Sequence, residues 1–168
     1  MIGSTNAVGG GGGYTPAPPE PSRNLWTTDQ TYPLSNGILY DPDTQTYTVP
    51  TTAKALIAYV YALPTPIAAG TEVTLSVYYD SGRSQKGSVV VGGYHQGSDG
   101  NSWEPQSGNI AVNTDLAGTK KVVTATTTKT VTHFVIFVDS SVVGKIDEDI
   151  VFRVQYELGG TATEWVPH

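Results

Sequence analysis

The stretch from residue 153 to residue 168 reads RVQYELGGTATEWVPH, and it follows DIVF at residues 149–152. Its apolar residues alternate and predict a β strand over 149–158. On this strand Val151, Arg153 and Gln155 share one face, with Phe152, Val154, Tyr156 and Leu158 spread over the pleat. Gly159 and Gly160 predict a turn, and residues 163–166 predict a last short strand. We therefore expect the chain to end inside the fold, pinned there by Trp165.

From Asn24 onward, short segments rich in Val, Thr and Tyr are separated by clusters of Gly, Pro, Asn and Asp, as in an all-β sandwich. The run from Ala53 to Leu63 is ambiguous, because its Ala, Lys and Leu favour a helix whereas Ile57 and Tyr59 to Tyr61 favour a strand that Pro64 would end. The predicted strands lie near 37–41, 45–49, 54–63, 71–79, 87–94, 110–113, 120–127, 131–138, 149–158 and 163–166.

Residues 66–80, PIAAGTEVTLSVYYD, give the clearest strand in the middle of the chain. Gly70 supplies the turn, after which Val73, Leu75 and Val77 point to one face and Thr74, Ser76 and Tyr78 to the other. The sequence therefore predicts that these two sets of side chains lie on opposite faces of the strand.

Three segments resemble the carbohydrate-binding-type jelly rolls of bacteriophage structural proteins: Asn24-Leu25-Trp26, residues 66–80 and the chain ending. The ending matches the family pattern "vQLE.GstaTeW.P" at Val154, Gln155, Glu157, Gly159 or Gly160, Thr161, Ala162, Thr163, Glu164, Trp165 and Pro167. The resemblance implies a jelly-roll β-sandwich over residues 24–168 in a phage virion protein. Trp26 and Trp165 are expected to close that sandwich.

Residues 1–23 form a Gly/Pro-rich segment that cannot bury enough apolar surface to fold alone. Its glycines are flexible, while its prolines favour an extended, semi-rigid spacer. Two interpretations stay open: a disordered leader, or an extended N-terminal arm that anchors the protein to a partner. The anchoring candidates are Gly9, Gly13, Tyr14, Pro16, Pro18, Pro19 and Pro21.

The 168 residues suffice for one domain with a sizeable core, and the absence of cysteine excludes disulfides and thiolate metal sites. A net charge of −6 with nine scattered Lys and Arg residues argues against nucleic acid as a partner. No apolar run approaches the roughly 20 residues that a membrane helix needs. A secretory signal peptide is not expected, because the first residues lack its basic and apolar regions.

The sequence offers little for catalysis, and we predict that the protein is not an enzyme. His95, His133 and His168 have no Ser, Asp or Glu at the spacing of a triad. Asp147-Glu148-Asp149 could supply two carboxylates for glycoside hydrolysis. A solvated acidic turn is the favoured interpretation, since a perturbed site also needs a cleft and partners.

No cofactor is predicted, although a structural calcium ion is a minor hypothesis at Asp41-Pro42-Asp43. Carboxylates at alternate positions of a tight loop suit calcium, and jelly-roll carbohydrate modules often carry this ion. The alternative is a type I turn in which Asp41 accepts backbone hydrogen bonds. This turn by itself lacks the six or more oxygens that calcium takes.

The segment from Gly92 to Asn109 is predicted to be a long loop, and loops of this length are usually functional or disordered. Aromatic rings can stack on the CH face of a sugar, while polar side chains bond its hydroxyl groups. The glycan-binding candidates are Tyr94, His95, Asp99, Asn101, Trp103 and Glu104. The alternative is a flexible loop tip with one packed Trp.

Together these features predict a bacteriophage virion accessory protein on the virion surface, anchored by residues 1–23 to other capsid or tail proteins. A capsid decoration protein is favoured; a minor tail or receptor-binding protein that recognises host glycans is the first alternative. A carbohydrate-binding module accompanying a polysaccharide hydrolase is the second. A homo-oligomer is expected, because the polar strand edge at residues 124–132 could pair with another copy.

Overall fold

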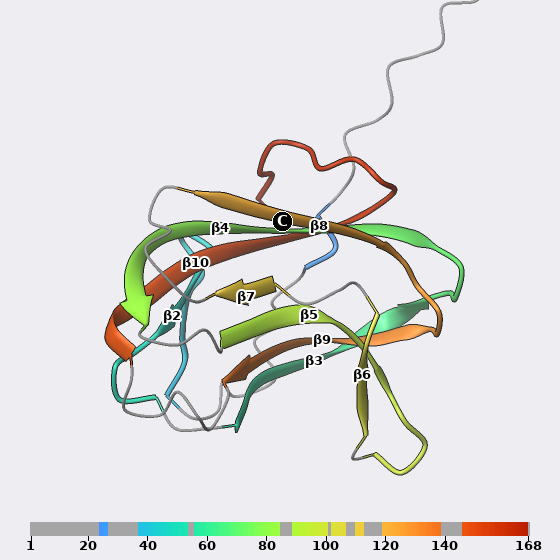
Figure 1. Cartoon of the computed structure of the whole chain (residues 1–168), viewed down its shortest axis with the longest axis horizontal. Helices are drawn as coiled ribbons and strands as arrows, with labels where there is room; N and C mark the ends of the chain where they lie inside the picture. The colour runs from blue at the N-terminus through green and yellow to red at the C-terminus, as the bar shows by residue number, and fades with distance from the viewer. Residues whose placement is uncertain are drawn as a thin grey trace, which may run out of the picture.

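The computed structural model describes residues 24–26, 37–53, 56–84, 89–100, 102–106, 110–112, 119–138 and 146–167. Every regular element in these ranges is a β strand, so the prediction of an all-β fold is confirmed (Figure 1). In chain order the strands are β1 (Leu39–Asp41), β2 (Thr46–Val49), β3 (Leu56–Ile67), β4 (Glu72–Ser84), β5 (Val89–Gln96), β6 (Trp103–Pro105), β7 (Ile110–Val112), β8 (Lys120–Thr126), β9 (Val131–Val138) and β10 (Ile146–Leu158).

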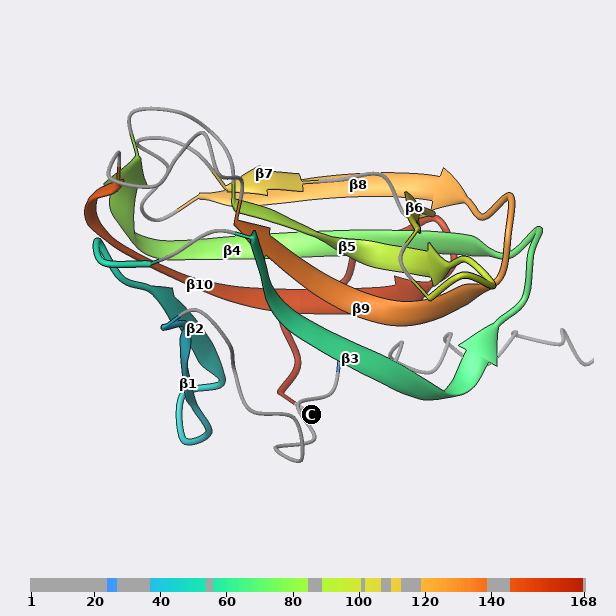
Figure 2. The same cartoon turned by 90° about the horizontal axis from the view of Figure 1, so that it is seen from below.

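The strands form two antiparallel sheets that pack face to face as a β-sandwich. The first sheet has the order β1-β2-β10-β4-β8, and the second has the order β3-β9-β5-β6, with β7 also pairing with β5. Figure 2 shows the strands of the second sheet lying over those of the first. The pairings are nested along the chain: β5 pairs with β6 and β7, β4 with β8, β3 with β9, and β2 with β10. Strands distant in sequence therefore become neighbours in both sheets.

Alternate residues of the central strands fill the space between the sheets. In β4 the buried residues are Val73, Leu75 and Val77, which share one face as the sequence predicted, and in β10 they are Phe152, Val154 and Tyr156. Each of these side chains is at most 2% exposed. Burial of aliphatic and aromatic side chains of this size contributes roughly 1.5–3 kcal/mol each. The core thus rests on the period-two pattern of β4 and β10.

Residues 24–26 lie beside β10 and close one side of the core. The backbone N–H of Leu25 donates to the carbonyl of Tyr156 at 2.8 Å. Trp26 is fully buried, stacks on Phe134 with ring centroids 4.7 Å apart, and donates its Nε1–H to Tyr47 Oη at 3.0 Å. The predicted role of Trp26 in closing the sandwich is therefore confirmed.

Residues 159–167, which we call the C-terminal segment, cross the outer face of the first sheet (Figure 1). The predicted strand at 163–166 is wrong, because side chains rather than a backbone ladder hold the segment. Gln155 Oε1 accepts from the N–H of Val166 at 2.9 Å, and Thr163 Oγ1 donates to Glu157 Oε1 at 2.5 Å. Gln155 and Glu157 are fully buried although they point away from the core.

The sequence predicted that Trp165 pins the chain end inside the fold, and this prediction is wrong. Trp165 is half-buried on the outer face, where the guanidinium of Arg153 lies 4.9 Å from its ring centroid. The expectation that Trp165 closes the sandwich is wrong, because its ring lies beside Arg153 on the outer face, whereas Trp26 is stacked on Phe134 in the core.

Strand β3 continues to Ile67 through Pro64 and Pro66, so the prediction that Pro64 ends the strand is wrong. β3 is an edge strand, and its register with β9 shifts between Ala62 and Ile67. Proline cannot donate to a strand ladder, but an edge strand with an irregularity does not require that donor. Both prolines are exposed at this position.

Candidate functional site

The predicted loop at residues 92–109 is instead built around a β-hairpin, so its description as a long unstructured connection is wrong. β5 pairs with β6 in the register Tyr94 to Pro105, His95 to Glu104 and Gln96 to Trp103. The hairpin projects from one end of the sandwich (Figure 1). Backbone pairing thus fixes residues that the sequence had placed on a long loop.

Asp99 holds the turn of this hairpin. Its Oδ1 accepts from the N–H of Ser102 at 2.9 Å and from Ser102 Oγ at 2.7 Å. The N–H of Gly97 donates to the carbonyl of Ser102 at 2.9 Å, closing the turn. Asp99 therefore has a structural role in addition to its predicted glycan contact. Asn101, another glycan-binding candidate, lies outside the described residues.

Two of the candidates, Tyr94 and Trp103, share the outer side of the second sheet with His133. Tyr94 is opposite both Pro105 and His133 in the two ladders. Trp103 is half-buried and meets the His133 ring edge-on, with centroids 5.1 Å apart and an interplanar angle of 82°. We call these three residues the hairpin aromatic cluster. Tyr94 is only 8% exposed, so Trp103 is the ring of this cluster that can stack on the CH face of a sugar.

His133 is the residue of this cluster that sequence reasoning had not included. Burial lowers the pKa of His133 from its ordinary value of 6.5, so the imidazole is neutral at pH 7. Its Nδ1 lies 2.8 Å from Thr132 Oγ1. A neutral ring retains one acceptor nitrogen, which suits hydrogen bonding to a hydroxyl group. Only the ladder between β5 and β9 brings this residue next to the hairpin.

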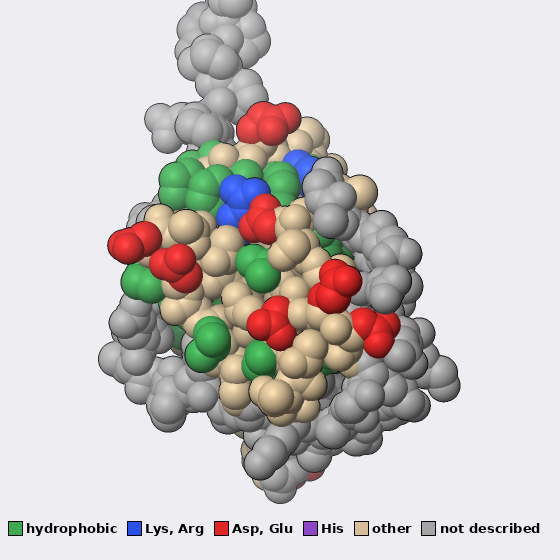
Figure 3. Space-filling view, turned by 90° about the vertical axis from the view of Figure 1, so that its left-hand side faces the viewer, with side chains coloured by type: hydrophobic (Ala, Val, Ile, Leu, Met, Phe, Trp, Pro, Cys, Tyr) green, Lys and Arg blue, Asp and Glu red, His purple; other side chains and the backbone are tan. Residues whose placement is uncertain are grey.

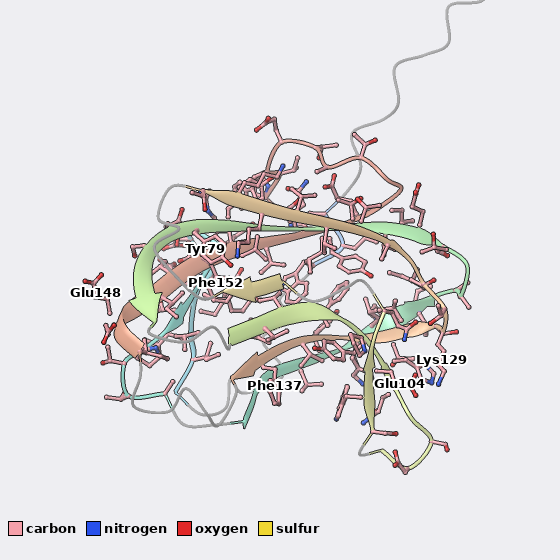
Figure 4. The ribbon with its side chains drawn as sticks, in the orientation of Figure 1. Tyr79, Glu104, Lys129, Phe137, Glu148 and Phe152 are labelled. Atoms are coloured by element: carbon pink, nitrogen blue, oxygen red, sulfur yellow. The ribbon has the colours of Figure 1, made fainter. Side chains whose placement is uncertain are left out.

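The other two candidates, His95 and Glu104, face the opposite side of the hairpin and are engaged by residues 129 and 130. His95 Nδ1 lies 2.9 Å from the carbonyl of Thr130. Glu104 forms an exposed ion pair with Lys129 at 2.7 Å, which Figure 4 shows beside the hairpin. The candidates that the structure describes therefore do not form one surface. Tyr94 and Trp103 form an aromatic side, whereas His95 and Glu104 fasten the hairpin to the connection between β8 and β9.

Gln106 is a second residue that sequence reasoning missed, and it anchors the end of the hairpin. Its buried Oε1 accepts from the N–H of Thr128 at 3.1 Å, from Thr128 Oγ1 at 3.0 Å and from the N–H of Lys129 at 2.7 Å. The N–H of Gln106 donates to the carbonyl of Gly93 at 2.8 Å. Within a polar segment rich in Ser and Gly, no sequence feature distinguishes this glutamine.

In the turn between β1 and β2, Asp41 accepts backbone hydrogen bonds, as expected for the turn that was the alternative to a calcium site. Asp41 Oδ1 accepts from the N–H of Asp43 at 2.9 Å, and Thr44 Oγ1 donates to Asp41 Oδ2 at 2.8 Å. The Thr44 hydroxyl and then the Asp43 N–H lower the pKa of the exposed Asp41 carboxyl. Among the described residues, no three His, Asp or Glu side chains gather where they could hold a metal ion. Calcium at Asp41 and Asp43 stays a prediction.

Two further sets of residues were singled out in the sequence. Asp147, Glu148 and Asp149 are exposed at the start of β10, and Figure 4 shows Glu148 projecting from one end of the molecule. They belong to a strand rather than to the solvated turn that was expected. The anchoring candidates Gly9, Gly13, Tyr14, Pro16, Pro18, Pro19 and Pro21 lie outside the described residues, as does His168.

Protein-family models, curated proteins and solved structures give no significant match to this chain. In the described part of the chain, no helix is long and apolar enough to cross a membrane.

Proposed function

We propose that this chain is a bacteriophage virion accessory protein whose sandwich is displayed on the particle surface and contacts host glycans. The observation that carries the binding role is the hairpin aromatic cluster, in which Trp103 of the projecting hairpin and His133 of the neighbouring β9 form a half-buried pair. Gln96, opposite Trp103 in the ladder, adds an amide beside the rings. Aromatic surface bordered by polar groups is the composition of a sugar-binding site.

The phage assignment is supported by the resemblance of the chain ending and by the strand pairing. We propose that the sandwich is a jelly roll. The nested pairs, from β5 with β6 and β7 outward to β2 with β10, are those of one long hairpin rolled into two sheets. The jelly roll is a double-sheet architecture that recurs in viral capsid and lectin domains.

We further propose that residues 1–23 anchor the protein to the particle, and that the capsid is its site. A small chain with a single display domain favours capsid decoration, and a minor tail protein that recognises host glycans is the alternative. Deleting residues 2–23 should abolish incorporation into particles while the circular dichroism of the sandwich stays unchanged. Normal incorporation would disprove the anchor, and labelling the chain in intact virions distinguishes capsid from tail.

The glycan contact is tested by Trp103→Ala. Removing the indole should weaken retention on host cell-wall polysaccharide by about fivefold or more, since stacking of this kind contributes about 1 kcal/mol or more. Leu39→Ala is the matched control, because Leu39 is 61% exposed on β1, in the other sheet. If Trp103→Ala and Leu39→Ala are retained equally, or if the protein binds nothing on a glycan array, a purely structural role is favoured. Either result would count against host adhesion and against a polysaccharide-binding module.

We also propose that the protein forms a homo-oligomer through β8. β8 is the last strand of the first sheet, and Val122 on it is 47% exposed. An edge strand offers backbone donors and acceptors to another copy. Light scattering of the purified full chain measures the state, and Val122→Lys should lower the mass if β8 forms the contact. A monomer in the unmodified protein would refute this part.

A further inference from the structure

Four side chains form a row on the outer face of the first sheet, next to the C-terminal segment. Lys120 Nζ lies 4.8 Å from the centroid of the Tyr78 ring, and the Arg153 guanidinium carbon lies 5.9 Å from the same centroid. On its other side Arg153 lies 4.9 Å from the Trp165 centroid. The order Lys120, Tyr78, Arg153 and Trp165 alternates cations with rings, and we call these four residues the cation–aromatic row.

Backbone pairing sets the positions in this row. Tyr78 is opposite Lys120 in the ladder with β8 and opposite Arg153 in the ladder with β10. Trp165 arrives from the C-terminal segment, which is fixed where Gln155 Nε2 donates to the carbonyl of Glu164 at 3.2 Å and Gln155 Oε1 accepts from Val166. Three strands and one segment thus hold the row before any ligand arrives, which lowers the entropic cost of binding.

The charges in the row differ from those of the whole chain, whose net charge is −6. Arg153 forms a two-bond pair with Asp80, Nη2 to Oδ1 at 2.7 Å and Nε to Oδ2 at 3.2 Å, with both side chains about one-third exposed. Lys120 is exposed and donates to the carbonyl of Thr163 at 2.8 Å. In the described part of the chain it has no carboxylate within ion-pair distance, so one positive charge is left uncompensated here.

On the surface, Lys and Arg side chains lie next to hydrophobic side chains near the top of the face in Figure 3, with carboxylates beside them. The surface therefore combines two partly exposed rings, a cation and a carboxylate–guanidinium pair.

We propose that the cation–aromatic row binds an acidic saccharide, meaning a sugar unit that carries a carboxylate or a phosphate. The exposed part of the Trp165 ring stacks on the CH groups of the sugar. The paired Asp80 and Arg153 offer an acceptor and donors to neighbouring hydroxyl groups. Lys120 takes the anionic group through a charge-assisted hydrogen bond. This site is on a different sheet from the hairpin aromatic cluster and does not rest on the proposed function.

The test is calorimetric titration of the full chain with three saccharides: oligogalacturonate, a glycerol-phosphate teichoic acid fragment and a neutral cello-oligosaccharide. At least one anionic saccharide should bind, more weakly as salt is raised, and the neutral one should bind at least about tenfold more weakly. Comparing the two anionic saccharides distinguishes a carboxylate from a phosphate ligand.

Lys120→Met keeps the aliphatic stem and removes the charge, so it should weaken binding by about tenfold. Lys121→Met is the matched control, because it removes the same charge from the neighbouring position, which faces the other side of β8. Trp165→Ala should also weaken binding, and should this variant fail to fold, Lys120→Met carries the test alone. Lys120→Met should weaken binding by the same factor when Trp103→Ala is also present, which separates the row from the hairpin.

Three results would overturn the proposal. They are the absence of binding by both anionic saccharides at millimolar concentration, equal binding of the anionic and neutral saccharides, and equal affinity of the variants Lys120→Met and Lys121→Met.

Discussion

Replacing Asn24 with alanine removes an amide that joins the start of the sandwich to its last strand. Asn24 is 1% exposed. Its Oδ1 accepts from the N–H of Trp26 at 3.0 Å and from the N–H of Tyr156 at 3.0 Å. Its Nδ2 donates to the carbonyl of Val154 at 3.2 Å and, less closely, to that of Val166 at 3.4 Å. One side chain thus satisfies backbone groups of residues 26, 154, 156 and 166.

Alanine at this position leaves two backbone donors and one well-placed acceptor without their partner. An unsatisfied buried polar group costs about 1–3 kcal/mol, and water that enters the space left by the amide recovers part of this cost. We expect Asn24→Ala to lower the free energy of unfolding by about 3 kcal/mol. For a chain of this length, that corresponds to a fall in Tm of about 6–12 °C.

Urea denaturation followed by tryptophan fluorescence measures this change, since Trp26 reports on the same region. Gln96→Ala is the control: its amide makes one exposed hydrogen bond, to the carbonyl of Gly100 at 2.9 Å, and its loss should cost less than about 0.5 kcal/mol. If Asn24→Ala lowers the free energy of unfolding by less than about 1 kcal/mol at an unchanged m value, the amide does not secure residues 24–26 to β10 and the argument is refuted.

Gly82 has φ +104°, and an added Cβ would meet the backbone of residues 149 and 150, so Gly82→Ala should lower the free energy of unfolding in urea by more than about 2 kcal/mol. The atoms nearest to a Cβ added at Gly160 belong to the movable carboxylate of residue 72, so Gly160→Ala should cost little. Gln106→Ala should cost about 2 kcal/mol in the same assay, because three donors lose their acceptor. Burial lowers the folded pKa of His133, so the unfolded state binds more protons below pH 6.5 and stability falls as the pH drops from 6.5 through the folded pKa. Trp103→Ala should raise the pKa of His133 toward 6.5 in an NMR titration and reduce this loss; an unchanged pKa would show that the indole does not desolvate the ring.

The sequence by itself determined the local features that depend on neighbouring residues. The alternation of Val73, Leu75 and Val77 specifies which face of β4 is buried, because successive side chains of a strand point to opposite sides. Asp41 followed by Pro42 and Asp43 specifies a turn, because a short carboxylate can accept from the backbone two residues on. Apolar alternation and turn residues were therefore enough for the all-β class and for most strand positions.

Only the tertiary structure decided features that join distant parts of the chain. Gln155 and Glu157 are polar residues on the outer face of β10, and they are buried only because the C-terminal segment crosses them. Trp103 meets His133 because β5 pairs with both β6 and β9. The alternation of apolar and polar residues indicates which side chains share a face of a strand. Which segment covers that face depends on contacts between residues far apart in sequence. For this reason Trp165, expected in the core, lies outside on Arg153.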